Sequence, residues 1–118
     1  AILPEVKLLL VNLVNIGKPI AALCVSPVVL AKALEGSNIH PSLTIGTTAA
    51  ASPYDIEAFS QGLEKTGATT AYKTVKEIHV DQVNKIITAP CYMMDATISE
   101  VWKNIQQAVG ELKKMATL

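Results

Sequence analysis

The chain has 118 residues, half of them apolar, and its 10 basic side chains balance 10 acidic ones. A chain of this length buries a single core, so we expect one domain or a part of one. Because the balanced charge creates no long-range field, binding to nucleic acid or to an anionic membrane surface is disfavoured. The most apolar stretch, residues 20–34, is interrupted by Ser26, Pro27 and Lys32 and is too short to span a bilayer.

Hydrophobic periodicity predicts an alternation of helices and strands along the chain. In chain order the predicted elements are helix 4–15, strand 20–25, helix 27–34, strand 43–45, helix 55–66, strand 68–72, a hairpin of strands 78–81 and 85–88, and a helix from about residue 96. The run 20–25 is apolar without alternation, which predicts a central parallel strand covered on both faces. Asn84 is expected to take the left-handed position in the hairpin turn. For the last helix we expect one apolar face, made of Ile98, Val101, Trp102, Ile105 and Val109.

The predicted order of elements is typical of an α/β sandwich with a mostly parallel sheet. A parallel sheet that starts from a helix lacks the strand that normally leads into that helix. The sequence also begins at Ala1 without an initiator methionine, a basic region or an apolar targeting segment. We therefore interpret residues 1–118 as the C-terminal part of a single larger domain.

Cys24 ends the apolar strand and is followed within three residues by Pro27, which suits a helix start. This is the arrangement of a nucleophile elbow, in which a helix dipole and nearby backbone N–H groups favour a thiolate and stabilise an oxyanion. The alternative is a small buried apolar residue at a strand end, as most free cysteines are. Cys91 is distant from Cys24 in sequence, and no CxxC pair or histidine stands at metal-ligand spacing. We therefore expect neither a disulfide nor a metal site, and we expect the protein to lie in a reducing compartment.

Several segments in this order resemble those of a known family and together span nearly the whole chain: 17–27 (GKPIAALCVSP), 43–46 (LTIG), 65–68 (KTGA), 78–81 (IHVD), 84–90 (NKIITAP) and Tyr92-Met93. They resemble the ThiJ/PfpI superfamily, which includes class I glutamine amidotransferase-like domains, and most of all its ElbB-like branch. The segment Ser52-Pro53-Tyr54 resembles the eukaryotic, mitochondrial form of that branch.

The resemblance implies a flavodoxin-like three-layer sandwich with a mostly parallel sheet, present here as its C-terminal half. It implies that Cys24 is the nucleophile, that the backbone amide of Val25 contributes to an oxyanion pocket, and that an acidic residue from the absent first half hydrogen-bonds the thiol. Members with a Cys–His pair carry histidine directly after the strand that 43–45 matches, where this chain has Gly46. The hydrolytic dyad, and a glutaminase reaction that depends on it, are therefore disfavoured.

The other candidate side chains are interpreted as structural. His40 lies in a loop and is expected to be solvated, whereas His79 alternates with apolar neighbours and is expected to face solvent or the partner strand. Cys91 is expected to pack in the core. The pair Met93–Met94 is expected to pack in the core or at a dimer contact rather than to bind a metal.

Two functions remain open. The first, from the resemblance, is a cofactor-independent, glyoxalase-like or lyase-like enzyme in which Cys24 attacks a small reactive aldehyde. The second is a non-catalytic protein in which Cys24 senses oxidants, or in which the fold serves as a subunit of a larger assembly. The resemblance also implies a homo-oligomer and a location in the mitochondrial matrix, with the cytoplasm as the alternative.

Overall fold

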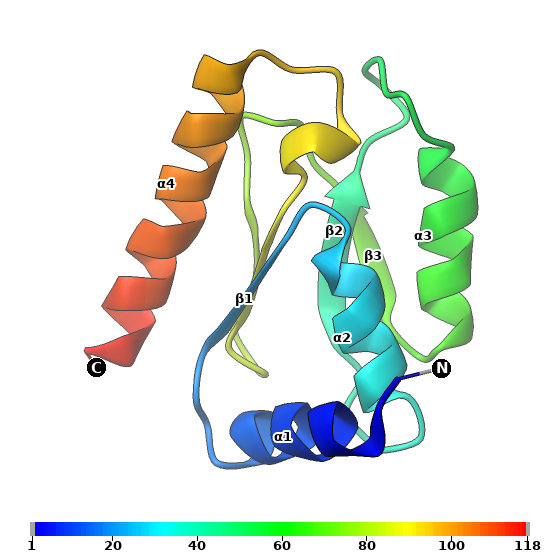
Figure 1. The fold of residues 1–118 in the computed structure, drawn as a ribbon, viewed down its shortest axis with the longest axis vertical. Helices are drawn as coiled ribbons and strands as arrows, with labels where there is room; N and C mark the ends of the chain where they lie inside the picture. The colour runs from blue at the N-terminus through cyan, green and yellow to red at the C-terminus, as the bar shows by residue number, and fades with distance from the viewer. Residues whose placement is uncertain (1, 118) are drawn as a thin grey trace.

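The computed structural model describes residues 2–117. They form an α/β fold in which helices pack around short strands (Figure 1). In chain order the elements are α1 Pro4–Asn15, β1 Ile20–Leu23, α2 Ser26–Leu34, β2 Ser42–Gly46, α3 Ile56–Lys65, β3 Thr69–Tyr72, β4 His79–Asp81, β5 Ile86–Ala89, the 3-10 helix η1 Cys91–Met93 and α4 Ile98–Ala116. Every predicted helix and strand is present, which confirms the α/β class.

The strands are mostly parallel, as predicted. β1 pairs in parallel with β5, β4 pairs antiparallel with the other side of β5, and β2 pairs in parallel with β3. The N–H of Ser42 donates to the carboxylate of Asp81, opposite Ile86, and the N–H of Thr44 donates to the hydroxyl of Thr88. Since these bonds follow β2 and β5 in the same direction, the carboxyl ends of β1, β2, β3 and β5 share one edge.

The core lies between the strands and their covering helices. Leu43 and Ile45 of β2 and Ile86 and Ile87 of β5 have no exposed surface. Burying each such side chain contributes about 1.5–3 kcal/mol. These strands therefore form the rigid base that positions the carboxyl edge. Over residues 2–117, no helix combines the length and apolar character needed to cross a membrane.

The position of β1 differs from the prediction of a central strand. Within residues 2–117, β1 pairs only with β5 and lies at the edge of its sheet, and Ala22 is its one fully buried residue. Residues 20–25 are apolar enough to suit a strand with neighbours on both sides. The prediction of a central strand is wrong for residues 2–117, because among them only β5 pairs with β1.

The buried face of α4 also differs from the predicted one. Its buried residues are Val101, Asn104, Ala108 and Met115. Of the predicted apolar face, Val101 is buried and Ile105 is half-buried against the core, whereas Ile98, Trp102 and Val109 have 80%, 59% and 51% of their surface exposed. The buried side-chain amide of Asn104 bonds to the backbone N–H of Cys91 and the backbone carbonyl of Glu77, so this polar residue has its hydrogen-bond partners on the buried face.

The hairpin turn places Lys85, and not Asn84, in the left-handed region, with φ 57°. Asn84 instead donates its backbone and side-chain N–H groups to the two carboxylate oxygens of Asp81, at 3.0 and 2.9 Å. Because these bonds fix Asn84 inside the turn, the positive φ falls on the next residue.

Candidate functional site

Cys24 lies on a sharp turn between β1 and α2. β1 ends at Leu23, α2 begins at Ser26, and Cys24 has a φ of 59°, in the left-handed region. This conformation costs a non-glycine residue about 1–2 kcal/mol, so neighbouring groups must hold it in place. The backbone N–H of Cys24 donates to the carbonyl of Ala89 at 3.0 Å and continues the ladder between β1 and β5 up to the turn. Its side chain is half-buried.

The first turn of α2 presents backbone N–H groups beside Cys24. Val25 is the N-cap residue, with φ −87° and ψ −10°, and its carbonyl accepts the N–H of Val28 at 3.0 Å. In the part of the chain that the structure describes, no side chain caps α2 and no acidic residue lies in its first turn. The N–H groups of Val25 and Ser26, together with the positive end of the helix dipole, can therefore meet an anion at this position.

Cys91 is a neighbour of Cys24 across the ends of β5 and β1. Leu23 lies opposite Ala89, so the same register places Cys24 opposite Pro90, the residue before Cys91. Burial raises the pKa of the Cys91 thiol, hydrogen bonding from the Cys24 backbone lowers it, and the nearby Cys24 thiol raises it. The structure thus brings together two cysteines that the sequence analysis treated separately, and it confirms that Cys91 is buried.

Asn104 of α4 holds Cys91 in position. Its Oδ1 accepts the backbone N–H of Cys91 at 2.9 Å, and its Nδ2 donates to the carbonyl of Glu77 at 2.9 Å. The side chain is fully buried. The role of Asn104 was not predicted from the sequence. One feature of the sequence could have indicated it: Asn104 stands three positions after the apolar Val101, and therefore on the same side of the helix.

Gly46, the last residue of β2, is closely surrounded by side chains. Gly46 has a φ of 128°, and a Cβ atom there would lie 2.8 Å from Sδ of Met94 and 3.1 Å from Cδ1 of Ile56. Met94 also accepts the backbone N–H of Thr47 through its sulfur, at 3.4 Å. A methionine from the loop after η1 thus occupies the space beside Gly46, as its predicted core packing requires.

The two histidines bind groups away from Cys24. Nδ1 of His40 lies 3.0 Å from the carbonyl of Gly67, so both residues are near the amino ends of β2 and β3, at the opposite edge of the sheet from Cys24. His79 in β4 is half-buried, and its Nε2 lies 2.7 Å from Oγ of Ser42. It therefore faces β2 rather than the expected solvent or paired strand β5.

His79 and Asp81 titrate in a partly buried environment. Burial, and then the positive charge of Lys73, lower the pKa of His79, while Asp81 raises it by less. Burial alone would raise the pKa of Asp81, but hydrogen bonds from Asn84, Ser42 and Val83 together bring it below its ordinary value. These bonds tie the hairpin to β2, so the two residues act in the fold and not at Cys24.

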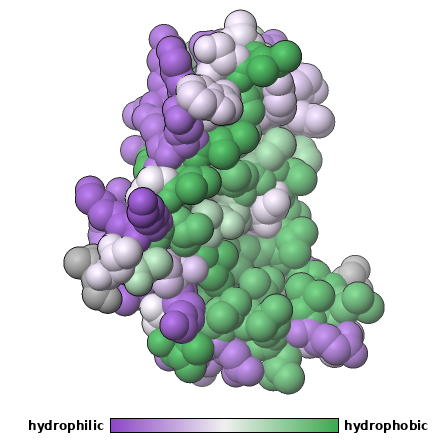
Figure 2. Space-filling view, turned by 60° about the vertical axis from the view of Figure 1, so that its left-hand side comes forward, coloured by the Kyte–Doolittle hydropathy of each residue, from purple (hydrophilic) through white to green (hydrophobic). Residues whose placement is uncertain are grey.

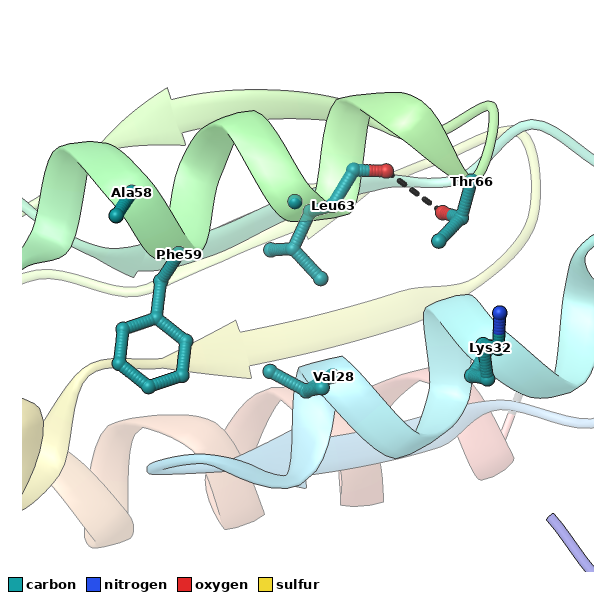
Figure 3. Close-up of a pocket in the computed structure, with 7 residues that line it drawn as sticks. Val28, Lys32, Ala58, Phe59, Leu63 and Thr66 are labelled. Carbon is teal, nitrogen blue, oxygen red and sulfur yellow. Dashed lines mark hydrogen bonds between the residues drawn. The ribbon is translucent and has the colours of Figure 1, made fainter. Parts of the chain in front are cut away.

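A cavity of about 380 Å³ lies between α2 and α3, lined by Val28, Lys32, Ala58, Phe59, Gly62, Leu63 and Thr66. Figure 3 shows Phe59 and Leu63 of α3 pointing toward Val28 of α2, with Lys32 at one end. The hydroxyl of Thr66 donates a hydrogen bond to the carbonyl of Leu63, at 2.6 Å. Since Lys32 is the only charged group in this apolar lining, the cavity lacks the convergent polar groups of a substrate site.

The described residues contain no cluster of three or more His, Cys, Asp or Glu side chains that could hold a metal ion. What they do contain is Cys24, half-buried and with a left-handed backbone, the uncapped amides of the helix that follows it, and a second cysteine, Cys91, just beyond the end of the paired strand β5. This arrangement suits thiol chemistry at the carboxyl edge of a parallel sheet, which is the edge where open α/β sheets bind their ligands.

No family model matches the chain. Its fold, however, is a flavodoxin-like α/β sandwich of the amidotransferase-like type, as a solved relative shows. The crystal structure of an isoprenoid biosynthesis protein with an amidotransferase-like domain from Ehrlichia chaffeensis matches with a TM-score of 0.82 and 25% identity, over 98% of this chain and 49% of that one.

Two curated proteins match 94% of the chain. Human "Glutamine amidotransferase-like class 1 domain-containing protein 3, mitochondrial" is 29% identical over 112 residues, and the rat "ES1 protein homolog, mitochondrial" is 27% identical. The chain spans 40% and 41% of the lengths of these relatives. The resemblance stated from the sequence motifs is thereby confirmed: the homologues of this chain are glutamine amidotransferase-like class 1 domain proteins, and these two are mitochondrial.

Proposed function

We propose that Cys24 is a nucleophile for small reactive carbonyl compounds, in a weak glyoxalase-like reaction. The observation that supports this most is the left-handed backbone of Cys24 between β1 and α2. Strained residues of this kind persist where the surrounding structure enforces them, and they are common at active sites. Here the left-handed residue stands directly before Val25, the N-cap of α2.

The reaction starts when the Cys24 thiolate attacks the aldehyde carbon of a 2-oxoaldehyde. A C–S bond forms, the π electrons move to the carbonyl oxygen, and the N–H of Val25 donates to that oxyanion. A base then moves the proton from the former aldehyde carbon to its neighbour, and water releases a 2-hydroxy acid and the thiol. Because this chain has Gly46 where a histidine would stand, we assign the role of base to the acidic residue that the family resemblance implies in the rest of the domain.

The test is methylglyoxal turnover by the purified full-length protein and its variants. Cys24→Ala and Cys24→Gly should both remove turnover, and the glycine variant relieves the backbone strain, so that loss of folding does not explain the result. Asn38→Gly is the matched control, because Asn38 is exposed and also left-handed, with φ 67°. Turnover that survives in Cys24→Ala, or that is absent from the unmodified protein, would overturn the proposal.

We also propose that residues 1–118 are one half of a larger domain, whose other half covers an exposed apolar surface. This surface is made of Val6, Leu8 and Leu9 of α1, the unpaired edge of β1, and Ile98, Trp102 and Val109 of α4. Figure 2 shows apolar side chains over much of this side of the molecule. A cavity of about 210 Å³ opens there, lined by Leu10, Ile20, Ala21, Ala22, Ser26, Val29 and Leu30.

The occupant that fits this surface is the part of the domain that the relatives have and this chain lacks. The chain spans about two fifths of the curated relatives, and an unpaired strand edge needs another strand to complete its hydrogen bonds. A fragment of 118 residues should therefore bind a co-expressed remaining segment as a 1:1 complex, and Leu9→Glu should weaken that complex. Self-association of the fragment into a homo-oligomer through the same surface, unchanged by the remaining segment, would contradict this assignment.

The location proposed for the chain is the mitochondrial matrix, because two of its curated relatives are mitochondrial. Protease protection of the full-length protein in isolated mitochondria, lost only after both membranes are opened, is the expected result. Recovery in the cytosolic fraction would favour the alternative location.

A further inference from the structure

Two cysteines stand at adjacent strand ends, and each has an unusual backbone. Cys24 and Cys91 have φ values of 59° and 49°, in the left-handed region that non-glycine residues rarely adopt. Each follows a strand of the parallel pair β1 and β5, and the N–H of Cys24 bonds to Ala89, two residues before Cys91. The backbone therefore bends after each of the two strands, at the residue that carries the sulfur atom.

The strand pairing places the two cysteines near one another. Neighbouring strands are about 4.8 Å apart, and a disulfide joins Cα atoms that are about 4.4–6.8 Å apart. The register of β1 and β5 ends with Leu23 opposite Ala89, so Cys24 and Cys91 stand one and two residues beyond this pair, where the backbone turns out of both strands. The influence of both the backbone and the thiol of Cys24 on the pKa of Cys91 agrees with this proximity.

We propose that Cys24 and Cys91 are a two-cysteine redox site, in which a hydroperoxide oxidises Cys24 and Cys91 then closes an intramolecular disulfide. In the first step the Cys24 sulfur attacks the outer peroxide oxygen, the O–O bond breaks, and the products are a sulfenic acid and an alcohol or water. In the second step the Cys91 sulfur attacks the sulfenic sulfur, the S–O bond breaks, and the hydroxyl leaves as water with the thiol proton. A dithiol restores both cysteines and is itself oxidised to a disulfide.

The surroundings assign different roles to the two thiols. Cys24 is half-buried beside uncapped helix amides, so a peroxide can reach it. Cys91 is only 3% exposed and is anchored by Asn104 through its backbone N–H, so it meets Cys24 and not the solvent. The pair would protect Cys24 from irreversible oxidation to sulfinic acid, because disulfide closure consumes the sulfenic acid first.

The test is mass spectrometry of the reduced full-length protein after one equivalent of hydrogen peroxide, with free thiols blocked by alkylation. Cleavage after lysine puts Cys24 in peptide 8–32, since Pro19 protects Lys18, and puts Cys91 in peptide 86–103. We expect these peptides to be joined and to separate on reduction. In Cys91→Ser, Cys24 should instead accumulate as sulfenic acid, trapped by dimedone, and then as sulfinic acid. Sulfinic acid at equal rates in both proteins, or a disulfide only between molecules, would overturn the proposal.

This inference shares the reactive Cys24 thiol with the proposed function, and the same variants distinguish their failures. Methylglyoxal turnover that persists in Cys91→Ser, without a joined peptide in the unmodified protein, would refute the redox pair alone. A joined peptide together with undetectable turnover would refute the carbonyl chemistry alone. Asn38→Gly should leave both results unchanged.

Discussion

Replacing Gly46 by alanine should destabilise the protein by about 2–4 kcal/mol. A φ of 128° is suited to glycine, and holding another residue there costs about 1–3 kcal/mol. The new Cβ atom would also lie 2.8 Å from Sδ of Met94 and 3.1 Å from Cδ1 of Ile56. Both atoms are ends of flexible side chains, so their displacement adds only about 1 kcal/mol, at the low end of the cost of overpacking.

Urea denaturation followed by circular dichroism measures this change. Gly62→Ala is the control, because Gly62 lies inside α3 and its Cβ would meet nothing within 4 Å, so it should stabilise the protein by up to about 1 kcal/mol. Gly46→His should be at least as destabilising as Gly46→Ala and should not create hydrolytic activity. A free energy of unfolding for Gly46→Ala within about 0.5 kcal/mol of the unmodified protein, the usual range for harmless surface changes, would refute the reasoning.

Three further predictions follow from single contacts. Asn104→Ala leaves the N–H of Cys91 without its partner and should cost about 2–4 kcal/mol in urea denaturation, whereas a loss below about 1 kcal/mol would mean that the bond is replaced. Thr97→Ala removes the capping box of α4 and should cost about 1 kcal/mol, with Thr117→Ala at the other end as a near-neutral control. Because the pKa of His79 is lowered in the folded chain, its contribution to stability is complete above about pH 6.5 and declines as the pH falls below that value. His79→Gln should flatten the pH dependence of the urea midpoint, and an unchanged slope would contradict this.

Local sequence signals were enough to predict the elements and the class of fold. Helix 4–15 and the residues around Cys24 carry strong local patterns, namely helical spacing and an apolar run followed by proline. The hairpin was also predicted at the correct place. Each of these features depends on residues that are close together in sequence.

The features that the sequence did not predict depend on distant contacts. The proximity of Cys24 and Cys91 results from the register between β1 and β5, which sequence periodicity does not specify. The buried face of α4 includes Asn104, which bonds to backbone groups outside the helix, and only part of the predicted apolar face is buried, so that Trp102 is exposed. The edge position of β1 depends on which neighbours the chain itself contains.

Reactivity of the Cys24 thiol in the native full-length protein is the most direct measure of the central claim, that the fold presents this sulfur for chemistry. Iodoacetamide labelling at neutral pH, followed through peptide 8–32, gives its rate in the native and in the urea-unfolded state. We predict faster labelling of Cys24 in the native state than in the unfolded state, while Cys91 in peptide 86–103 is labelled only after unfolding. Native Cys24 that resists labelling until the protein unfolds would contradict the account.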